Sequence, residues 1–305
     1  MEQFYVIGKV INVNQGANFY NINIEVEDKT LLNIKLNPDL TYEIIVGQIY
    51  RFLVKPEYKV NKENIIINNL VSYISIEKLA DEVDLVSLYQ IFYDFSPIDP
   101  VRARNLIEKT IENIDNQVIK DITKQIYLRY KADFYLHPAA TKFHHAYIGG
   151  LAHHTYTMLK MVDQFVDIYP FLNKDLLNGG IILHDISKIK EMTGVDGEYT
   201  KEGLLIGHIV MQTIEIFDVA KELGYQDFEE VLLLEHMIVS HHGQLNFGSP
   251  KRPQIAEALA LWFFDTIDSK FSVLENEIKL TKENDFTTNI AVIDKTRFYK
   301  HKLTK

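Results

Sequence analysis

The pattern of hydrophobic residues changes near residue 75 of the 305-residue chain, and this change limits the possible folds more than any other feature. Before it, five short runs are rich in β-branched and aromatic residues, and some are separated by turn formers such as Asn-Gln-Gly and Asn-Lys-Glu-Asn. After it, apolar residues recur at intervals of three and four, as in amphipathic helices. The five runs are QFYVIGKVINV, FYNINIEVE, TLLNIKLN, YEIIVGQIYRFLV and NIIINNLVSYI.

Five strands in so short a segment predict a small closed barrel of the OB type, although a small sandwich or an SH3-like barrel would give much the same pattern. We therefore predict an α+β protein in four parts. The OB-like barrel occupies residues 1–75, a helical connector 76–137, an all-α bundle 138–280 and a basic tail 281–305. From Phe286 onward, the tail carries five lysines and arginines against one aspartate.

Composition excludes several classes of protein. With 47% hydrophobic and 24% charged residues, the chain is expected to be a soluble globular protein. It has no cysteine, which excludes disulfides, thiolate zinc sites and cysteine nucleophiles. We find no signal peptide and no apolar run long enough to cross a membrane, so we expect a cytoplasmic protein with no membrane partner. The net charge of −10 argues against nonspecific coating of nucleic acid, but not against an enzyme that binds phosphates through metal ions.

Histidines are strongly clustered, since ten of the eleven lie between His137 and His242. The segment FHHAYIGGLAHHTYTMLKMVDQFV has apolar or small residues every three or four positions, and His154 borders that stripe. His153 is turned away from it by about 100°, so the residue expected to bind a metal is His154. His144 and His145 could reach the rim of the same cavity.

The stretch IILHDISKIKE, Ile181 to Glu191, places His184 and Asp185 directly after three aliphatic residues. A buried carboxylate needs a partner, because an unpaired buried charge is expensive. That partner is either a lysine or arginine, or a divalent cation. Lys188 lies one turn further along the same row as His184.

Further histidines and aspartates occur in the apolar helical runs that follow. His208 lies in EGLLIGHIVMQTIEIF, His241 and His242 follow VLLLEHMIVS, and Asp265 comes three residues after Trp262. One such histidine would more often be a hydrogen-bonded core residue than a ligand. Five consecutive helices that each contribute an inward histidine or aspartate instead predict a metal site, and the number of ligands suggests two adjacent ions.

The order H…HD…H…HH…D resembles the HD-domain superfamily of metal-dependent phosphohydrolases. The resemblance extends to the YhaM-type 3′-5′ exoribonucleases, is dense from about residue 137 to 271, and returns at the tail motif RFYK. That family joins an OB-fold domain, which binds nucleic acid, to an HD domain. The matching segments are FHHAYIGGLAHHT, ILHDISKIKE, GHIV, LLLEHMIVSHHGQLNFGSPKRP and WFFDTIDSK.

The resemblance implies roles for single residues. Asp185 would be catalytic as the carboxylate that bridges two ions, and Lys188 would be catalytic by contacting a substrate phosphate. His144 and His145 would add positive charge near the leaving phosphate, and Asp268 would support the site from outside the ligand set. The implied metal ligands are His154, His184, Asp185, His208, His241, His242 and Asp265.

Two residues depart from the family pattern. Ser187 replaces the glycine that usually precedes the lysine, and His153 stands where an acidic residue is expected. Neither is an expected ligand, but both could alter how a phosphate approaches.

The resemblance implies hydrolysis of single-stranded RNA from its 3′ end to nucleoside 5′-monophosphates by a metal-activated water. DNA is a second polymer to consider, and the oligomeric state is left open. Manganese is the first choice of metal, although cobalt, iron and zinc accept the same ligands. A second interpretation is an HD-domain phosphohydrolase acting on small nucleotides or cyclic dinucleotides. A third is a nucleic-acid-binding or regulatory protein whose HD domain is mainly structural.

Overall fold

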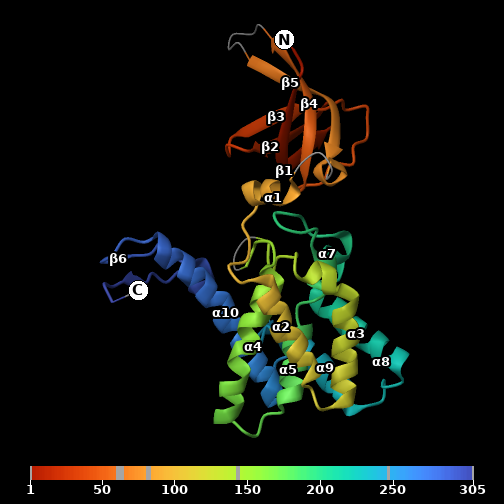
Figure 1. The fold of residues 1–305 in the computed structure, drawn as a ribbon, viewed down its shortest axis with the longest axis vertical. Helices are drawn as coiled ribbons and strands as arrows, with labels where there is room; N and C mark the ends of the chain where they lie inside the picture. The colour runs from red at the N-terminus through yellow and green to blue at the C-terminus, as the bar shows by residue number, and fades with distance from the viewer. Residues whose placement is uncertain (1, 60–64, 80–83, 142–144, 246–247, 304–305) are drawn as a thin grey trace. The chain divides into compact units, whose positions relative to one another are not determined.

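The computed structural model describes residues 2–59, 65–79, 84–141, 145–245 and 248–303 and contains two compact units. The first unit is Met1–Phe95 together with Thr193–Glu198, and the second is Ser96–Met192 together with Tyr199–Lys305. The first unit holds a five-stranded closed barrel and the second is built from helices (Figure 1), which confirms the predicted α+β class. The functional division into barrel, connector, phosphohydrolase domain and tail stays a prediction.

The barrel has the strand order β1-β2-β3-β5-β4, in which β3 and β5 are parallel and the other neighbours antiparallel. Its core follows from residue alternation, since Tyr20, Ile22 and Ile24 of β2 are buried while Asn21 and Asn23 face outward. The strands are β1 (Phe4–Gly16), β2 (Phe19–Val26), β3 (Leu31–Lys35), β4 (Ile49–Lys59) and β5 (Ile65–Ser75).

The fourth strand begins later than the sequence pattern predicts. The pattern starts at Tyr42, but β4 starts at Ile49. Tyr42, Ile44 and Val46 pack against the barrel core without strand pairing, and Gly47 then turns the chain with a φ of +85°. Burial alone therefore explains the apolar alternation before Ile49. A 3₁₀ turn, η1 (Ile76–Leu79), and helix α1 (Leu85–Phe92) complete this unit.

Helix α5 lies at the centre of the second unit and packs against α2, α3, α4, α9 and α10. Two glycines permit this close packing. A Cβ on Gly179 would lie 2.8 Å from Cγ2 of Ile119, and one on Gly180 would lie 2.3 Å from Cε of Met237. The helices are α2 (Pro100–Glu112), α3 (Gln117–Phe134), α4 (Gly150–Ile168), α5 (Lys174–Leu183), α6 (Lys188–Glu191), α7 (Lys201–Leu205), α8 (His208–Leu223), α9 (Glu229–Ser240) and α10 (Ala256–Leu280).

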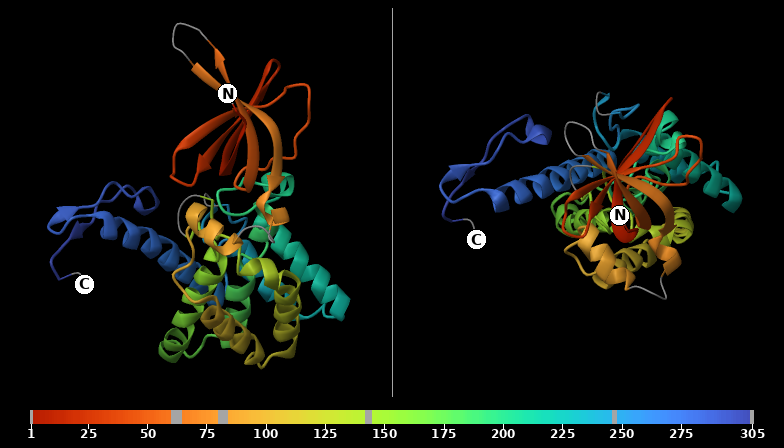
Figure 2. Two further views of the ribbon diagram at one scale, coloured as in Figure 1. Left: turned by 45° about the horizontal axis from the view of Figure 1, so that its top comes forward. Right: turned by 90° about the horizontal axis from the view of Figure 1, so that it is seen from above.

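Helix α10 extends beyond the other helices of its unit and carries a small hairpin at its C-terminal end (Figure 2). The hairpin pairs β6 (Asp285–Phe286) with β7 (Tyr299–Lys300), and the 3₁₀ turn η3 (Ala291–Ile293) lies between them. The segment predicted as a basic tail thus contains ordered structure. Within the described ranges, no helix combines the length and apolar character that a membrane span requires.

Candidate metal centre

Three of the predicted histidines stand at helix ends rather than on helix faces. His184 caps the C-terminus of α5, His241 caps the C-terminus of α9, and His208 is the first residue of α8. The sequence pattern places all three inside helices, because an apolar run gives the spacing of residues but not the point at which a helix stops. The chain turns after each of the two C-caps, and these turns bring Asp185 and His242 close to the three histidines.

The helix ends also orient two of these imidazoles. Nδ1 of His184 lies 2.8 Å from the carbonyl oxygen of Ile181, and Nδ1 of His241 lies 2.7 Å from that of Ile238. The last carbonyls of a helix lack partners within it, so each ring donates its Nδ1–H to one of them. This fixes the tautomer and leaves Nε2 with a lone pair that faces the centre.

The first group of ligand atoms lies around His154, which α4 holds fully buried. Its Nε2 is 3.2 Å from Nε2 of His184, 3.9 Å from Oδ2 of Asp185 and 3.4 Å from Oδ1 of Asp265, which α10 contributes. Nε2 of His184 is 3.4 Å from Oδ2 of Asp185. Ligand atoms about 2.1 Å from one tetrahedral ion stand about 3.4 Å apart. The spacing therefore fits one divalent ion.

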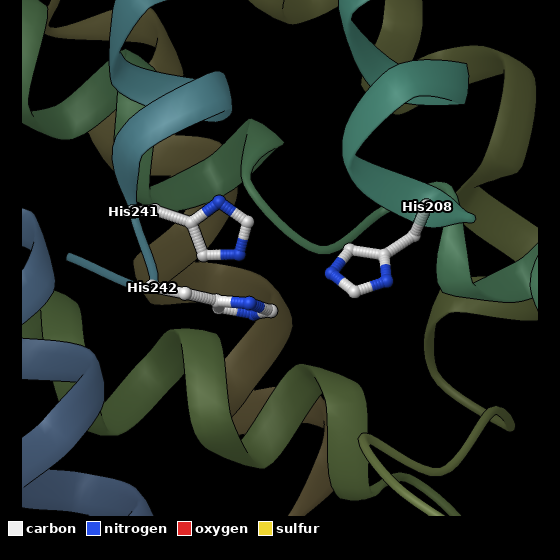
Figure 3. Close-up of side chains that lie close together, drawn as sticks. All are labelled: His208, His241 and His242. Carbon is white, nitrogen blue, oxygen red and sulfur yellow. The ribbon is translucent and has the colours of Figure 1, made fainter. Parts of the chain in front are cut away.

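The second group lies on the other side of the same carboxylate. Oδ1 of Asp185 is 3.6 Å from Nε2 of His208 and 3.8 Å from Nε2 of His241. The rings of His208, His241 and His242 turn toward a shared space (Figure 3), and these three residues form a group able to hold a metal ion.

Three buried polar atoms of the second group indicate that a ligand belongs beside them. Oδ1 of Asp185, Nε2 of His208 and Nε2 of His241 are buried and have no hydrogen-bond partner among the described residues. Buried polar atoms are rarely left in this state, because desolvation without compensation is costly. The residues present therefore fit a metal ion, which would satisfy all three atoms at once.

Charge stabilises the ionised form of Asp185. Burial alone would raise the pKa of this carboxyl, but Lys188 and His184 outweigh burial and hold the pKa well below its ordinary value. Nζ of Lys188 lies 2.8 Å from Oδ2 of Asp185. Burial lowers the pKa of Lys188, but Asp185 raises this pKa by more than burial lowers it, so the ammonium stays charged. A carboxylate and an ammonium are thus held together beside the histidines.

Two further carboxylates support the histidines from behind. Oδ2 of Asp268 lies 2.6 Å from Nδ1 of His154, and the implied role of Asp268 outside the ligand set stays a prediction. Both oxygens of Glu191 lie 2.9 Å from Nδ1 of His208, and Oε1 also accepts the backbone N–H of His208 at 3.0 Å. Glu191 was not predicted from the sequence. The one feature of the sequence that could have indicated Glu191 is its place as the last residue of the stretch IILHDISKIKE.

A loop before α4 adds His145 to the supporting contacts. His145 has a φ of +51°, a conformation that favours glycine, and a Cβ on Gly150 would come within 1.9 Å of its carbonyl oxygen. Nε2 of His145 donates to Oδ2 of Asp268 at 2.6 Å, and Nδ1 lies 2.6 Å from the Tyr147 hydroxyl. That hydroxyl also contacts Nδ1 of His153 at 2.5 Å.

These contacts bear on the predicted substrate residues. Both ring nitrogens of His145 are already hydrogen-bonded, while His144 lies outside the described residues. The predicted role of this pair at a substrate phosphate stays a prediction. Of the two departures from the family pattern, Ser187 is buried and donates to Oε1 of Gln212 at 2.7 Å, and His153 joins the Tyr147 contact.

Known proteins resemble this chain over most of its length, although no family model matches it. A protein of Geobacillus sp. (strain WCH70) is 39% identical over 227 residues, which cover 73% of this chain and 68% of the relative. Proteins of Bacillus pumilus and Bacillus subtilis are 40% and 39% identical over 210 residues, which cover 68% of this chain and 67% of each relative. All three are named 3′-5′ exoribonuclease YhaM.

Proposed function

The chain belongs to the family of YhaM-type 3′-5′ exoribonucleases, and from this premise we propose that it degrades single-stranded RNA from the 3′ end to nucleoside 5′-monophosphates. The observation that carries the proposal is the position of Asp185 between two groups of histidines. Its Oδ2 faces His154 and His184, and its Oδ1 faces His208 and His241. One carboxylate shared by two ligand groups is the arrangement expected of a two-metal phosphodiesterase.

The proposed cofactor is a pair of divalent ions, with manganese as the first choice and cobalt, iron and zinc as alternatives, because nitrogen and carboxylate ligands suit all four. His154, His184, Asp185 and Asp265 would hold the first ion. Asp185, His208, His241 and His242 would hold the second. When bound, such ions supply an activated water and neutralise charge on the phosphate.

Other residues of this chain would contact the substrate phosphate and orient the metal ligands. Lys188 is charged, nearly buried and fixed at 2.8 Å from Asp185, so it can place one positive charge beside a phosphate oxygen without rearranging. Glu191 and Asp268 keep His208 and His154 in the orientation that turns Nε2 inward. The buried surroundings limit water around the ligands, which strengthens these electrostatic contacts.

Labelled RNA with and without chelator tests this function. We expect 3′-labelled RNA to release its label first as a mononucleotide, and 5′-labelled RNA to shorten progressively. Activity should stop with chelator and return with Mn²⁺. Endonucleolytic fragments, or full activity in chelator, would contradict the proposal. Preferential turnover of mononucleotides or cyclic dinucleotides would favour the small-substrate interpretation instead.

The Asp185→Ala variant tests the site itself. It removes the one carboxylate that both ligand groups share, so we expect turnover to become undetectable while the helical circular-dichroism spectrum is retained. Asp218→Ala, a change at an exposed position on α8, is the matched control and should retain activity. Undiminished hydrolysis by Asp185→Ala would remove the basis of the assignment.

A further inference from the structure

The outer face of the barrel carries a connected set of asparagines, which we call the asparagine array: Asn12, Asn14, Asn21, Asn23 and Asn33. They come from three neighbouring strands. Asn12 lies opposite Asn23 and Asn14 opposite Asn21 across β1 and β2, and Asn23 lies opposite Asn33 across β2 and β3. Side chains directly opposite each other on one face are close enough to interact.

Their amides are hydrogen-bonded to one another. Oδ1 of Asn12 accepts from Asn14 at 3.0 Å and from Asn23 at 2.9 Å. Oδ1 of Asn21 accepts from Asn14 at 3.1 Å and from Asn33 at 3.3 Å. Asn33 also donates to Oδ1 of Asn23 at 2.7 Å. The network holds five polar side chains in fixed positions on a solvent-facing sheet.

Several groups of the array are left for a ligand. Among the described residues, the Nδ2 groups of Asn12 and Asn21 have no acceptor, and Oδ1 of Asn14 and Oδ1 of Asn33 accept no hydrogen bond. Both donors and acceptors of the array are therefore available to a ligand. Asparagine is a poor strand former, so five on one face are not explained by strand propensity.

An aromatic ring lies at one end of the array. Phe19 follows the turn between β1 and β2, is 51% exposed, and packs directly over Gly16, where a Cβ would come within 2.3 Å of its ring. The glycine thus lets the ring lie close to the backbone with its outer surface open. Lys35, opposite Asn21 on β3, is exposed and has no ion pair within the described part of the chain.

We propose that the asparagine array and Phe19 bind the bases of single-stranded RNA, by hydrogen bonds to base edges and by stacking. Amide groups match the donors and acceptors of base edges, and an exposed ring stacks on any base. The net charge of this segment does not favour RNA binding, because residues 1–75 contain seven lysines and arginines against eight aspartates and glutamates. The array itself offers no apolar area for a protein partner. This inference rests on the proposed function and adds how the substrate is held.

Base contacts and phosphate contacts differ in their dependence on salt. Each neutralised phosphate of a single strand lowers log K by about 0.7 per tenfold rise in salt, whereas neutral amides and stacked rings release no counterions. Loss of the array should therefore weaken RNA binding equally at low and high salt. Loss of Lys35 should instead reduce the salt dependence.

The test measures binding of a labelled single-stranded oligoribonucleotide to the full chain in chelator, which keeps the RNA intact. The variant combines Asn12→Thr, Asn21→Thr and Asn33→Thr, since threonine suits exposed strand positions. We expect at least a tenfold loss of affinity at both about 50 mM and about 200 mM salt with an unchanged slope. Phe19→Leu should lose about fivefold or more, the lower limit for one stacked base. Ser72→Thr, at an exposed position on β5, is the matched control. Unchanged affinity in the triple variant overturns the inference.

Photo-crosslinking of thiouridine-labelled RNA to the unaltered protein gives a result that does not depend on a variant folding. Trypsin releases residues 10–29 as one peptide, which contains Phe19 and four of the five asparagines. We expect the crosslink in this peptide, and crosslinks found only elsewhere would overturn the inference. The RNA degradation assay above is separate. If the protein degrades RNA but the binding and crosslinking results exclude the array, only the inference is refuted. If the protein does not degrade RNA, the proposed function is refuted.

Discussion

Glu191→Gln is the sharpest test of how the histidines are oriented, because it changes one atom outside the ligand set. Oε1 of Glu191 accepts both the backbone N–H and the Nδ1–H of His208, and Oε2 lies equally close to Nδ1 at 2.9 Å. Glutamine can keep Oε1 on the backbone N–H, but its Nε2 then faces Nδ1 as a second donor. The oxygen that remains must then serve both donors of His208, so the Nδ1–H tautomer, which leaves Nε2 free to bind a metal, is held less firmly.

The expected cost follows from this weaker support of the metal-binding tautomer. Replacement of a partner behind a metal-binding histidine lowers metal affinity about 10- to 100-fold, which is about 1.4–2.8 kcal/mol. We expect a loss of this size for the ion at His208, with the helix start preserved by the retained oxygen. Ions at His154 should be affected less, because Asp268 supports that ring instead.

Titration of the metal-free protein with Co²⁺, followed by visible absorption and by competition with a chelator, measures this effect. Glu229→Gln, an exposed change on α9, is the matched control and should bind like the parent. If Glu191→Gln binds the same number of ions with the same affinity and spectrum, the account of how His208 is oriented is refuted.

Three further predictions concern charge, packing and pH. Lys188→Met should lower kcat on RNA about 100-fold or more at saturating Mn²⁺, since it removes a fixed charge beside the phosphate, and an unchanged kcat would count against this role. Gly150→Ala should cost about 1–3 kcal/mol in urea unfolding, because its Cβ would meet the carbonyl oxygen of His145 at 1.9 Å, and parental stability would contradict that packing. Burial raises the pKa of Glu215, but Lys190 and Arg129 lower the pKa by more than burial raises it. The pKa of Glu215 therefore lies below the ordinary 4.5. The stabilisation by ionised Glu215 is fully present above pH 4.5 and is lost as the pH falls through the lowered pKa. The unfolding free energy of Glu215→Gln should therefore fall less steeply below about pH 5 than that of the parent protein. Identical pH profiles for the two proteins would contradict this prediction.

Much of the fold, and the presence of histidines and aspartates buried among apolar residues, could be predicted from the sequence because buried positions recur at regular intervals. The alternation of Ile22 and Ile24 with Asn21 and Asn23 identifies a strand with one buried face. A histidine and an aspartate that end an apolar run, as at His184, stand out because such groups are costly to bury without a partner. The comparisons with known proteins then confirmed the family that these residues suggest.

The remainder depends on contacts between residues far apart in the chain. The sequence does not show that α5 ends at Leu183, so it could not predict that the Ile181 carbonyl orients His184. The contact of Glu191 with His208 requires the turn through α7, and no spacing rule predicts it. The asparagine array likewise depends on strand register, which the sequence pattern leaves undetermined.

The central claim is that Asp185 is shared by two metal ions, and anomalous X-ray diffraction tests it most directly. Crystals grown with Mn²⁺ would be measured on both sides of the manganese absorption edge. We predict two anomalous peaks about 3.5–4 Å apart, one between His154 and His184 and the other beside His208 and His241, with Asp185 between them. A single peak, or peaks away from Asp185, would contradict the claim.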